Sequence, residues 1–280
     1  MSSTNGDPEI LSKIFARTPS GLEQIPVSWS DLIGDLLTFG KTCNGFMTVT
    51  GDDGAGKTTF IKKLIERAAG SQDCLHISTV ASDSRPGWLL RALTPWLSSS
   101  KDTFEGVYEN FALLGESQRP ILVCLDGGDI SQHSSLSLDI SSLMNLADAS
   151  NTKMSVVIFA NKSLISKMTE DGKLHSRIVF QASIPRFTDG ESSEFILNKL
   201  TSAGLKKRLT ENQLTNIVKQ AGGVPARLIQ GLATAFGHRA QATKNVPIAN
   251  EKHFSLKESK QDAESAKRVS LEDLLAPRKN

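Results

Sequence analysis

The sequence is poor in the features that would place the protein outside the cell or in a membrane. Its three cysteines, Cys43, Cys74 and Cys124, include no CxxC pair, which argues against a disulfide framework and against a zinc site. No apolar run approaches the roughly 18 residues that a membrane-spanning helix needs. The first nine residues are polar and lack the basic and apolar regions of a secretory signal. We therefore expect a cytoplasmic protein with no membrane span.

The sequence also lacks a dominant charge. Lysine and arginine number 32 against 30 aspartates and glutamates, which gives a formal net charge of +2. So small an excess creates no strong field toward nucleic acid or a membrane surface, and one tyrosine with three tryptophans offers little for stacking on bases. A basic cluster at 206–208 keeps nucleic-acid binding open, although a solvated turn between helices is the favoured interpretation.

What the chain has instead is a regular alternation of apolar strands and amphipathic helices. Short, continuously apolar runs are typical of strands buried on both faces of a parallel sheet, and the helical patterns between them predict the helices that cover it. The predicted fold is therefore α/β with a parallel five-stranded sheet. The strands expected are 46–50, 75–80, 121–125, 154–160 and 177–180, and the helices are 29–39, 58–69, 88–97, 103–115 and 136–149.

The pattern changes twice after the sheet. From about residue 187 only helical patterns follow, at 189–203, 210–220 and 224–237, which predict a small helical lid. From about 240 the chain is polar, and we expect it to be disordered. Within it, 269–277 is a short apolar motif that either docks on a protein partner or is an inert terminus. The expected organisation is a disordered start at 1–9, a P-loop α/β domain at 10–187, a lid at 188–239 and a tail at 240–280.

A glycine-rich loop follows the first strand. Gly51–Thr58 matches the P-loop pattern G-x-x-x-x-G-K-[ST] and stands between a strand and an amphipathic helix, as that pattern requires. Glycines let backbone N–H groups turn toward phosphate oxygens, which the positive end of the helix also faces. Lys57 is expected to reach the β- and γ-phosphates, and the Thr58 hydroxyl to bind Mg²⁺. The loop therefore predicts a site for ATP, or another nucleoside triphosphate, with Mg²⁺. The residues expected to bind it are Gly51, Asp52, Asp53, Gly54, Ala55, Gly56, Lys57, Thr58 and Thr59.

A second metal ligand is expected where the 121–125 strand ends. In P-loop proteins an aspartate at the end of a buried strand completes the Mg²⁺ site, and Asp126 has that place. The alternative is an aspartate that only begins a turn, since two glycines follow. Many P-loop ATPases carry next a glutamate that orients the attacking water, but position 127 is Gly here. Either Asp129 replaces that glutamate or hydrolysis is slow.

Asn161 follows the 154–160 strand, at the sheet edge that also carries the loop and Asp126. A polar side chain there is expected beside the γ-phosphate. Asparagine after a strand is equally a common turn former, so both roles stay open.

Together, the Gly51 loop, the Asp126 and Asn161 strands and the helical C-terminal part resemble an AAA+ ATPase. Two stretches are similar to ATPases of the ExeA/GspA type and the related TniB-like transposition regulators. Residues 177–204 begin with an Arg-Ile pair and contain an apolar helix ending in Ala-Gly, and 222–229 looks like a Gly-x-Pro-Arg motif with one residue inserted before Arg227. ExeA-type proteins usually continue into a membrane helix and a periplasmic region, which have no counterpart in this sequence.

The resemblance implies that Arg227 opens the last lid helix and senses the nucleotide, and that the chain self-associates with ATP. The residues expected to serve catalysis are then Lys57, Asp126, Asp129, Asn161 and Arg227. The expected function is a cytoplasmic ATPase, with slow or defective hydrolysis, that controls assembly of a bacterial envelope, secretion or motility complex. Two alternatives are a transposition-type regulator that binds DNA with ATP and a nucleotide-dependent scaffold that does not hydrolyse ATP.

Overall fold

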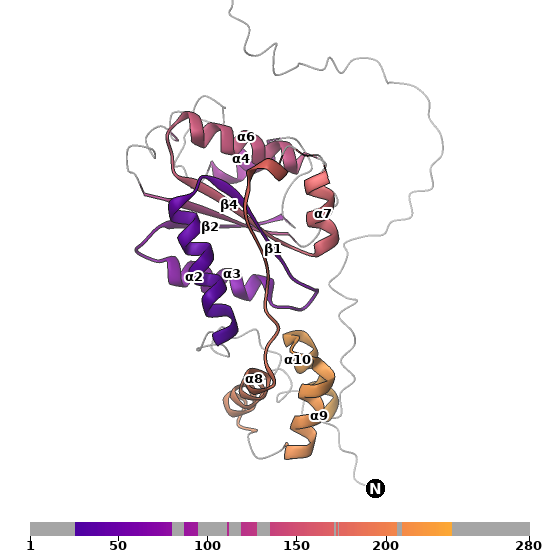
Figure 1. Cartoon of the computed structure of the whole chain (residues 1–280). Helices are drawn as coiled ribbons and strands as arrows, with labels where there is room; N and C mark the ends of the chain where they lie inside the picture. Colours follow the sequence, from indigo (N-terminus) through magenta and orange to yellow (C-terminus); the bar gives the residue numbers. More distant parts are fainter. Residues whose placement is uncertain are drawn as a thin grey trace, which may run out of the picture. The chain divides into compact units, whose positions relative to one another are not determined.

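The centre of the protein is a parallel sheet of five strands. The computed structural model describes residues 26–79, 87–94, 111, 119–127, 135–170, 172, 174–205 and 209–236. The strands pair in the order β2-β3-β4-β1-β5, and every pairing is parallel (Figure 1). They are β1 (Gly45–Thr50), β2 (Asp73–Ser78), β3 (Ile121–Asp126), β4 (Met154–Ala160) and β5 (Ile178–Ser183). The predicted α/β class and five-stranded parallel sheet are confirmed.

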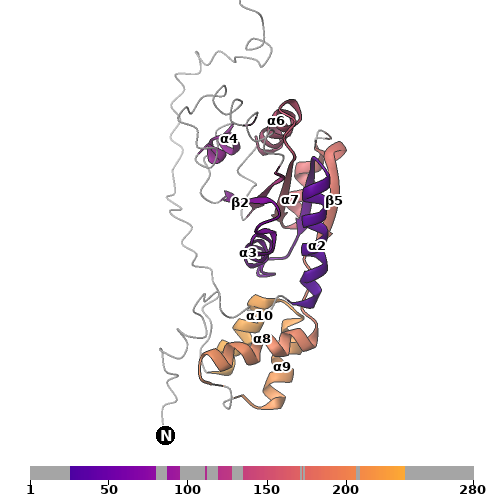
Figure 2. The same ribbon diagram turned by 90° about the vertical axis from the view of Figure 1, so that its left-hand side faces the viewer.

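Helices cover both faces of the sheet (Figure 2). Strand side chains alternate between the faces, so Met47 and Val49 join one apolar cluster and Phe46 joins the other. The first cluster is closed by α2 (Val27–Thr42) and α3 (Lys57–Ala68), and the second by α4 (Trp88–Leu93), α6 (Leu136–Ala149) and α7 (Lys162–Glu170). This layering places the carboxyl ends of all five strands at one edge.

The three central strands are buried along almost their whole length, whereas the edge strands β2 and β5 are partly exposed. Among the strands, the predicted bounds moved most in these two edge strands. The bounds of β4 and α6 match the prediction, because β4 is apolar along nearly its whole length and α6 keeps a helical spacing of apolar residues to both ends. The strand β5 continues past the predicted end at 180, since one face of an edge strand tolerates the polar residues Gln181 and Ser183.

The C-terminal part of the described chain is helical. A 3₁₀ turn, η4 (His175–Arg177), precedes β5, and α8 (Asp189–Ser202), α9 (Glu211–Ala221) and α10 (Pro225–Ala235) follow it. Capping boxes begin α8 at Thr188 and α9 at Thr210, and Pro225 is the first residue of α10. Buried residues of these helices belong to the same apolar cluster as α2 and α3. The lid therefore shares a core with the sheet.

Several predicted features lie outside the described residues. They are the start at 1–9, Asp129, the cluster 206–208 and the tail at 240–280 with its motif 269–277. Of the helix expected at 103–115 only Phe111 is described, and it is helical. Within the described part of the chain, no helix is long and apolar enough to cross a membrane.

Candidate nucleotide-binding site

Backbone hydrogen bonds bring the segments of the site to one edge of the sheet. Gly51 N–H donates to the Ala160 carbonyl at 2.9 Å, so the loop after β1 starts beside the end of β4. Ile184 N–H donates to the Thr50 carbonyl at 2.8 Å, which holds the segment after β5 on the other side of β1. The P-loop, Asn161 and the 184–187 connector thus leave the sheet as neighbours.

Two glycines give the P-loop its shape. Gly54 and Gly56 have φ of +80° and +91°, in the left-handed region that side chains disfavour. A Cβ on Gly54 would lie 2.5 Å from the Ala226 Cβ, and one on Gly56 would lie 3.1 Å from the Trp29 ring. No side chain of the described residues caps the start of α3. The first amides of α3 therefore remain for an anion, and the loop fits a phosphate group.

Lys57 lies over the same loop. Its Nζ donates to the carbonyl oxygens of Gly51 at 2.9 Å and Asp52 at 3.1 Å, and it is 3.8 Å from the Asp53 carboxylate. The side chain is mostly buried, whereas that of Asp53 is exposed. The lysine ammonium is thus held by weak, exchangeable partners at the loop that the sequence predicts to bind phosphate.

Thr58 and Asp126 meet although 68 residues separate them. Thr58 Oγ1 donates to Asp126 Oδ2 at 2.6 Å, and His76 Nε2 lies 3.5 Å from the same oxygen. Burial alone would raise the pKa of Asp126, but hydrogen bonds from His76 and Thr58 and the charge of Lys57 outweigh it and lower the pKa. The result is an ionised carboxylate beside a hydroxyl, a pair of hard oxygen ligands that suits Mg²⁺.

The protein's own groups would fill only part of a magnesium coordination shell. Among the described residues no three His, Cys, Asp or Glu side chains gather as a metal cluster. Magnesium commonly takes one or two protein oxygens together with phosphate oxygens and water. The two oxygen ligands that Thr58 and Asp126 offer are consistent with this type of magnesium coordination.

The position that would orient an attacking water has no side chain. Gly127 is buried, and its N–H donates to the Phe159 carbonyl at 3.0 Å. Asn161 Oδ1 accepts from Leu164 N–H at 2.9 Å and from Ser163 Oγ at 3.0 Å, and so caps α7. These contacts correspond to the turn-forming role of Asn161, and its role beside the γ-phosphate stays a prediction.

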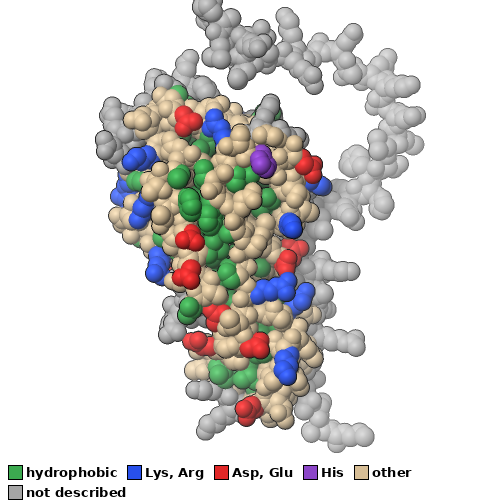
Figure 3. All heavy atoms as spheres, in the orientation of Figure 1, with side chains coloured by type: hydrophobic (Ala, Val, Ile, Leu, Met, Phe, Trp, Pro, Cys, Tyr) green, Lys and Arg blue, Asp and Glu red, His purple; other side chains and the backbone are tan. Residues whose placement is uncertain are grey.

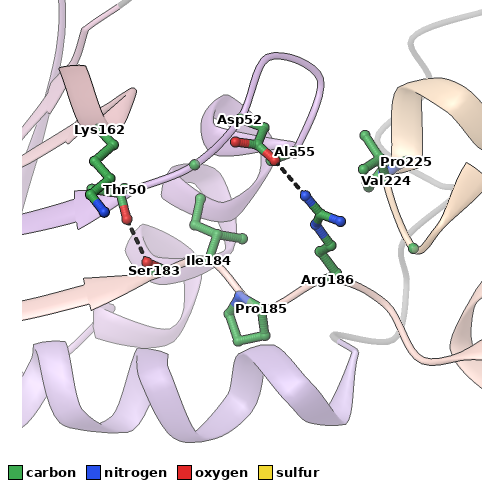
Figure 4. A pocket seen from close by; sticks show the side chains of 12 residues that line it. Thr50, Asp52, Ala55, Lys162, Ser183, Ile184, Pro185, Arg186, Val224 and Pro225 are labelled. Carbon is green, nitrogen blue, oxygen red and sulfur yellow. Dashed lines mark hydrogen bonds and ion pairs between the residues drawn. The ribbon is translucent and has the colours of Figure 1, made fainter. Parts of the chain in front are cut away.

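A cavity of about 250 Å³ opens between the P-loop, the connector and the start of α10 (Figure 4). Arg186 points into it from the connector, and its Nη2 lies 2.8 Å from Asp52 Oδ2. Lys162, the first residue of α7, lines the opposite side. The cavity thus adds two cations to the predicted phosphate loop. Its lining residues come from the end of β1 (50), the P-loop (51, 52 and 55), α7 (162), the end of β5 (183), the connector (184–186) and the lid (223–225).

The lid touches the P-loop directly. Ala226 N–H, in the first turn of α10, donates to the Gly54 carbonyl at 3.2 Å. Phe187 N–H donates to the Gly223 carbonyl at 3.0 Å, which ties the connector to the turn before α10. The positive end of a second helix therefore adjoins the cavity.

Arg227 is placed differently from the other predicted residues. It is exposed and lines a groove between α9 and α10, together with amide side chains such as Gln213, Asn216 and Gln220. It is not among the residues that line the cavity beside the P-loop. Its nucleotide-sensing role stays a prediction.

Sequence reasoning missed His76 and Arg186. A strand pairing of β2 with β3 would have placed His76 near Asp126, because Ser78 lies opposite Asp126 and His76 is two residues earlier on the same face. Arg186 lies in the 177–204 stretch but was given no role there, and only its place just after the last strand marks it. Asp52 contributes an acid that pairs with Arg186, a contact that the P-loop pattern does not predict.

Comparison with known proteins agrees with this architecture. No family model and no curated protein matches the sequence. Among solved structures, the Aeropyrum pernix ORC2 protein, solved as ADPNP–ADP complexes, is similar with a TM-score of 0.56 at 15% identity, over 80% of this chain and 68% of that chain. The Walker-type ATPase PABY2304 of Pyrococcus abyssi gives 0.57 at 14%, over 79% and 70%. Cdc6p from Pyrobaculum aerophilum gives 0.56 at 16%, over 81% and 67%.

These identities are low, and they establish the fold alone. The fold that this chain shares with these proteins is a parallel α/β sheet followed by a helical segment. The ExeA/GspA and TniB resemblance remains a hypothesis from the sequence.

Proposed function

We propose that this protein binds ATP with Mg²⁺ in its P-loop and acts as a nucleotide-dependent switch that hydrolyses ATP slowly. The proposal rests on the 2.6 Å contact between Thr58 Oγ1 and Asp126 Oδ2. Thr58 directly follows Lys57 in the sequence. A magnesium ion needs a hydroxyl and a carboxylate at that place, and a triphosphate needs the lysine beside them. Support also comes from the ORC2 relative in fold, which was solved with ADPNP and ADP.

Slow hydrolysis follows from the residue after Asp126. A buried glycine at 127 supplies no group to orient or deprotonate water. General base catalysis contributes about 10²–10⁴-fold to rates, so its loss leaves binding intact and turnover low. In this proposal the α3 amides and Lys57 bind the phosphates, and Thr58 and Asp126 bind the metal.

For the biological role, we propose what the sequence resemblance implies. Control of the assembly of a bacterial envelope, secretion or motility complex, with self-association in ATP, rests on the sequence resemblance. On the face drawn in Figure 3, Lys and Arg side chains lie interspersed with Asp and Glu. That face offers no continuous basic track for a nucleic-acid backbone, so the DNA-binding alternative gains no support there.

The test compares binding and turnover in one set of proteins. ATP binding in Mg²⁺ is measured by calorimetry, and phosphate release is measured alongside, for wild type, Lys57→Ala and Gly127→Glu. Lys63→Ala is the matched control, because Lys63 lies in the same helix and pairs with Glu66 at 2.7 Å. Size-exclusion chromatography with and without ATP reports self-association.

We expect wild type and Lys63→Ala to bind ATP alike and Lys57→Ala to bind at least about tenfold more weakly, as expected for loss of a charge-assisted contact. Gly127→Glu is expected to raise turnover by about tenfold or more. A wild type that binds no ATP, or a Lys57→Ala variant that binds as wild type does, would contradict the proposal.

A further inference from the structure

The ion pair between Asp52 and Arg186 joins the P-loop to the connector inside the cavity. Both side chains are well exposed, at 68% for Asp52 and 62% for Arg186. Exposed ion pairs contribute little to stability because water screens them and two side chains lose freedom. The contact is therefore easily exchanged for a better one.

The backbone around Arg186 is held on both sides. The carbonyl of Pro185 accepts from Trp29 Nε1 at 3.1 Å, and the ring of Phe187 packs against those of Trp29 and Phe195 at 5.5 and 5.8 Å between centroids. With its neighbours fixed, Arg186 can change partner by rotating its side chain alone. No movement of the lid is needed for that exchange.

A phosphate group is a stronger partner for this guanidinium than a carboxylate. Arginine donates two parallel hydrogen bonds to phosphate oxygens, and a triphosphate carries several negative charges. Lys162 and the start of α10 line the same cavity and add positive potential. Asp52, by contrast, places a negative charge on the loop that the phosphates are expected to occupy.

We propose that Arg186 binds the phosphate chain of the nucleotide and that Asp52 is a competitor built into the P-loop for the same guanidinium. This inference rests on the proposed function, because it assigns a further binding residue to that site. Binding of the nucleotide exchanges the Asp52 carboxylate for phosphate on Arg186. The affinity for ATP then depends partly on the strength of the Asp52–Arg186 ion pair, which must break before Arg186 binds phosphate.

The test is a double-mutant cycle in the full chain, with the dissociation constant of ATP in Mg²⁺ measured by calorimetry. The proteins are wild type, Asp52→Asn, Arg186→Gln and the double variant. Removing Asp52 also removes its direct repulsion of the phosphates, an effect that does not depend on Arg186. The cycle separates the two effects, since competition disappears once Arg186 is gone.

We expect Arg186→Gln to weaken ATP binding about tenfold. Asp52→Asn is expected to strengthen it about threefold in wild type, with a clearly smaller effect in the Arg186→Gln background. Arg186→Lys keeps the charge but loses the paired N–H donors of the guanidinium, so its affinity for ATP should lie between those of wild type and Arg186→Gln. The controls are Arg119→Gln and Asp73→Asn, a partly exposed pair of the same 2.8 Å length at the start of β2, which should leave ATP binding unchanged.

Arg186→Gln with wild-type affinity overturns the inference, as does an Asp52→Asn effect of equal size in both backgrounds. Failure of the proposed function looks different, because no protein of the set then binds ATP. A melting temperature for each variant shows that the compared proteins are folded.

Discussion

Glu191 caps two helices at once, and its removal should measurably loosen the joint between sheet and lid. Its carboxylate accepts from Ser28 N–H at 3.0 Å and Ser28 Oγ at 3.2 Å, in the first turn of α2. It also accepts from Thr188 N–H at 2.8 Å and Thr188 Oγ1 at 3.0 Å, in the capping box of α8. The positive ends of α2 and α8 thus share one carboxylate.

The size of the effect follows from these four contacts. Loss of a capping residue costs about 1 kcal/mol, and the contacts with Ser28 add a similar amount after allowance for partial exposure. We expect Glu191→Ala to reduce the free energy of unfolding by about 2 kcal/mol. For a domain of this size that lowers the melting temperature by about 4–8 °C.

The effect should also depend on pH. Burial alone would raise the pKa of Glu191, but the hydrogen bonds from Ser28 and Thr188 outweigh it and lower the pKa. A carboxyl whose pKa is lowered by folding adds stability above its ordinary pKa and loses that contribution as pH falls through the folded value. The difference between wild type and Glu191→Gln should therefore shrink from about pH 6 to about pH 3.

Thermal unfolding followed by circular dichroism provides the measurement, with Glu194→Ala as the control, since Glu194 is an exposed carboxylate of the same helix. Equal melting temperatures of Glu191→Ala and wild type at neutral pH would contradict this prediction. It is equally refuted if the difference between wild type and Glu191→Gln stays constant into acid.

Three further predictions concern packing and the lid. Gly54→Ala should lower the melting temperature more than Gly70→Ala, because both glycines have positive φ, but only at Gly54 does the new Cβ meet Ala226, at 2.5 Å; equal shifts would disprove the clash. Trp29→Ala, which removes a fully buried ring from beside Phe60, should cost about 3–5 kcal/mol of unfolding free energy in denaturant titrations, whereas Val27→Ala, at a 78% exposed position, should cost little. Because Arg227 lines the α9–α10 groove, Arg227→Ala should change the dissociation constant of ATP less than Arg186→Gln does; the reverse order would support the sensing role implied by the resemblance.

Much of the fold could be predicted because local pattern and burial agree. The strand β4 is apolar throughout and buried throughout, so its bounds could be read directly. The edge strand β5 alternates, and its polar end could not be told from a loop. Strand order depends on pairing between distant segments that no single segment records, so the order β2-β3-β4-β1-β5 was not predicted.

In the site, too, local sequence predicts some features and long-range contacts determine the others. The meeting of Thr58 and Asp126 could be predicted, because magnesium chemistry favours a hydroxyl and a carboxylate after neighbouring strands. The binding of nucleotide by Lys57, and of magnesium by Thr58 and Asp126, stays a prediction. His76 and Arg186 could not be predicted, since their roles come from neighbours in space: His76 from the pairing of β2 with β3, and Arg186 from its contact with Asp52.

In the proposed site, Thr58 and Asp126 hold a magnesium ion for ATP on the P-loop. The most direct measurement is calorimetric titration of ATP into wild type and Asp126→Asn, each in Mg²⁺ and in EDTA. We expect saturable binding to wild type that weakens when Mg²⁺ is chelated, and weak binding to Asp126→Asn that does not respond to Mg²⁺. Binding that ignores both the metal and the Asp126 substitution would contradict it.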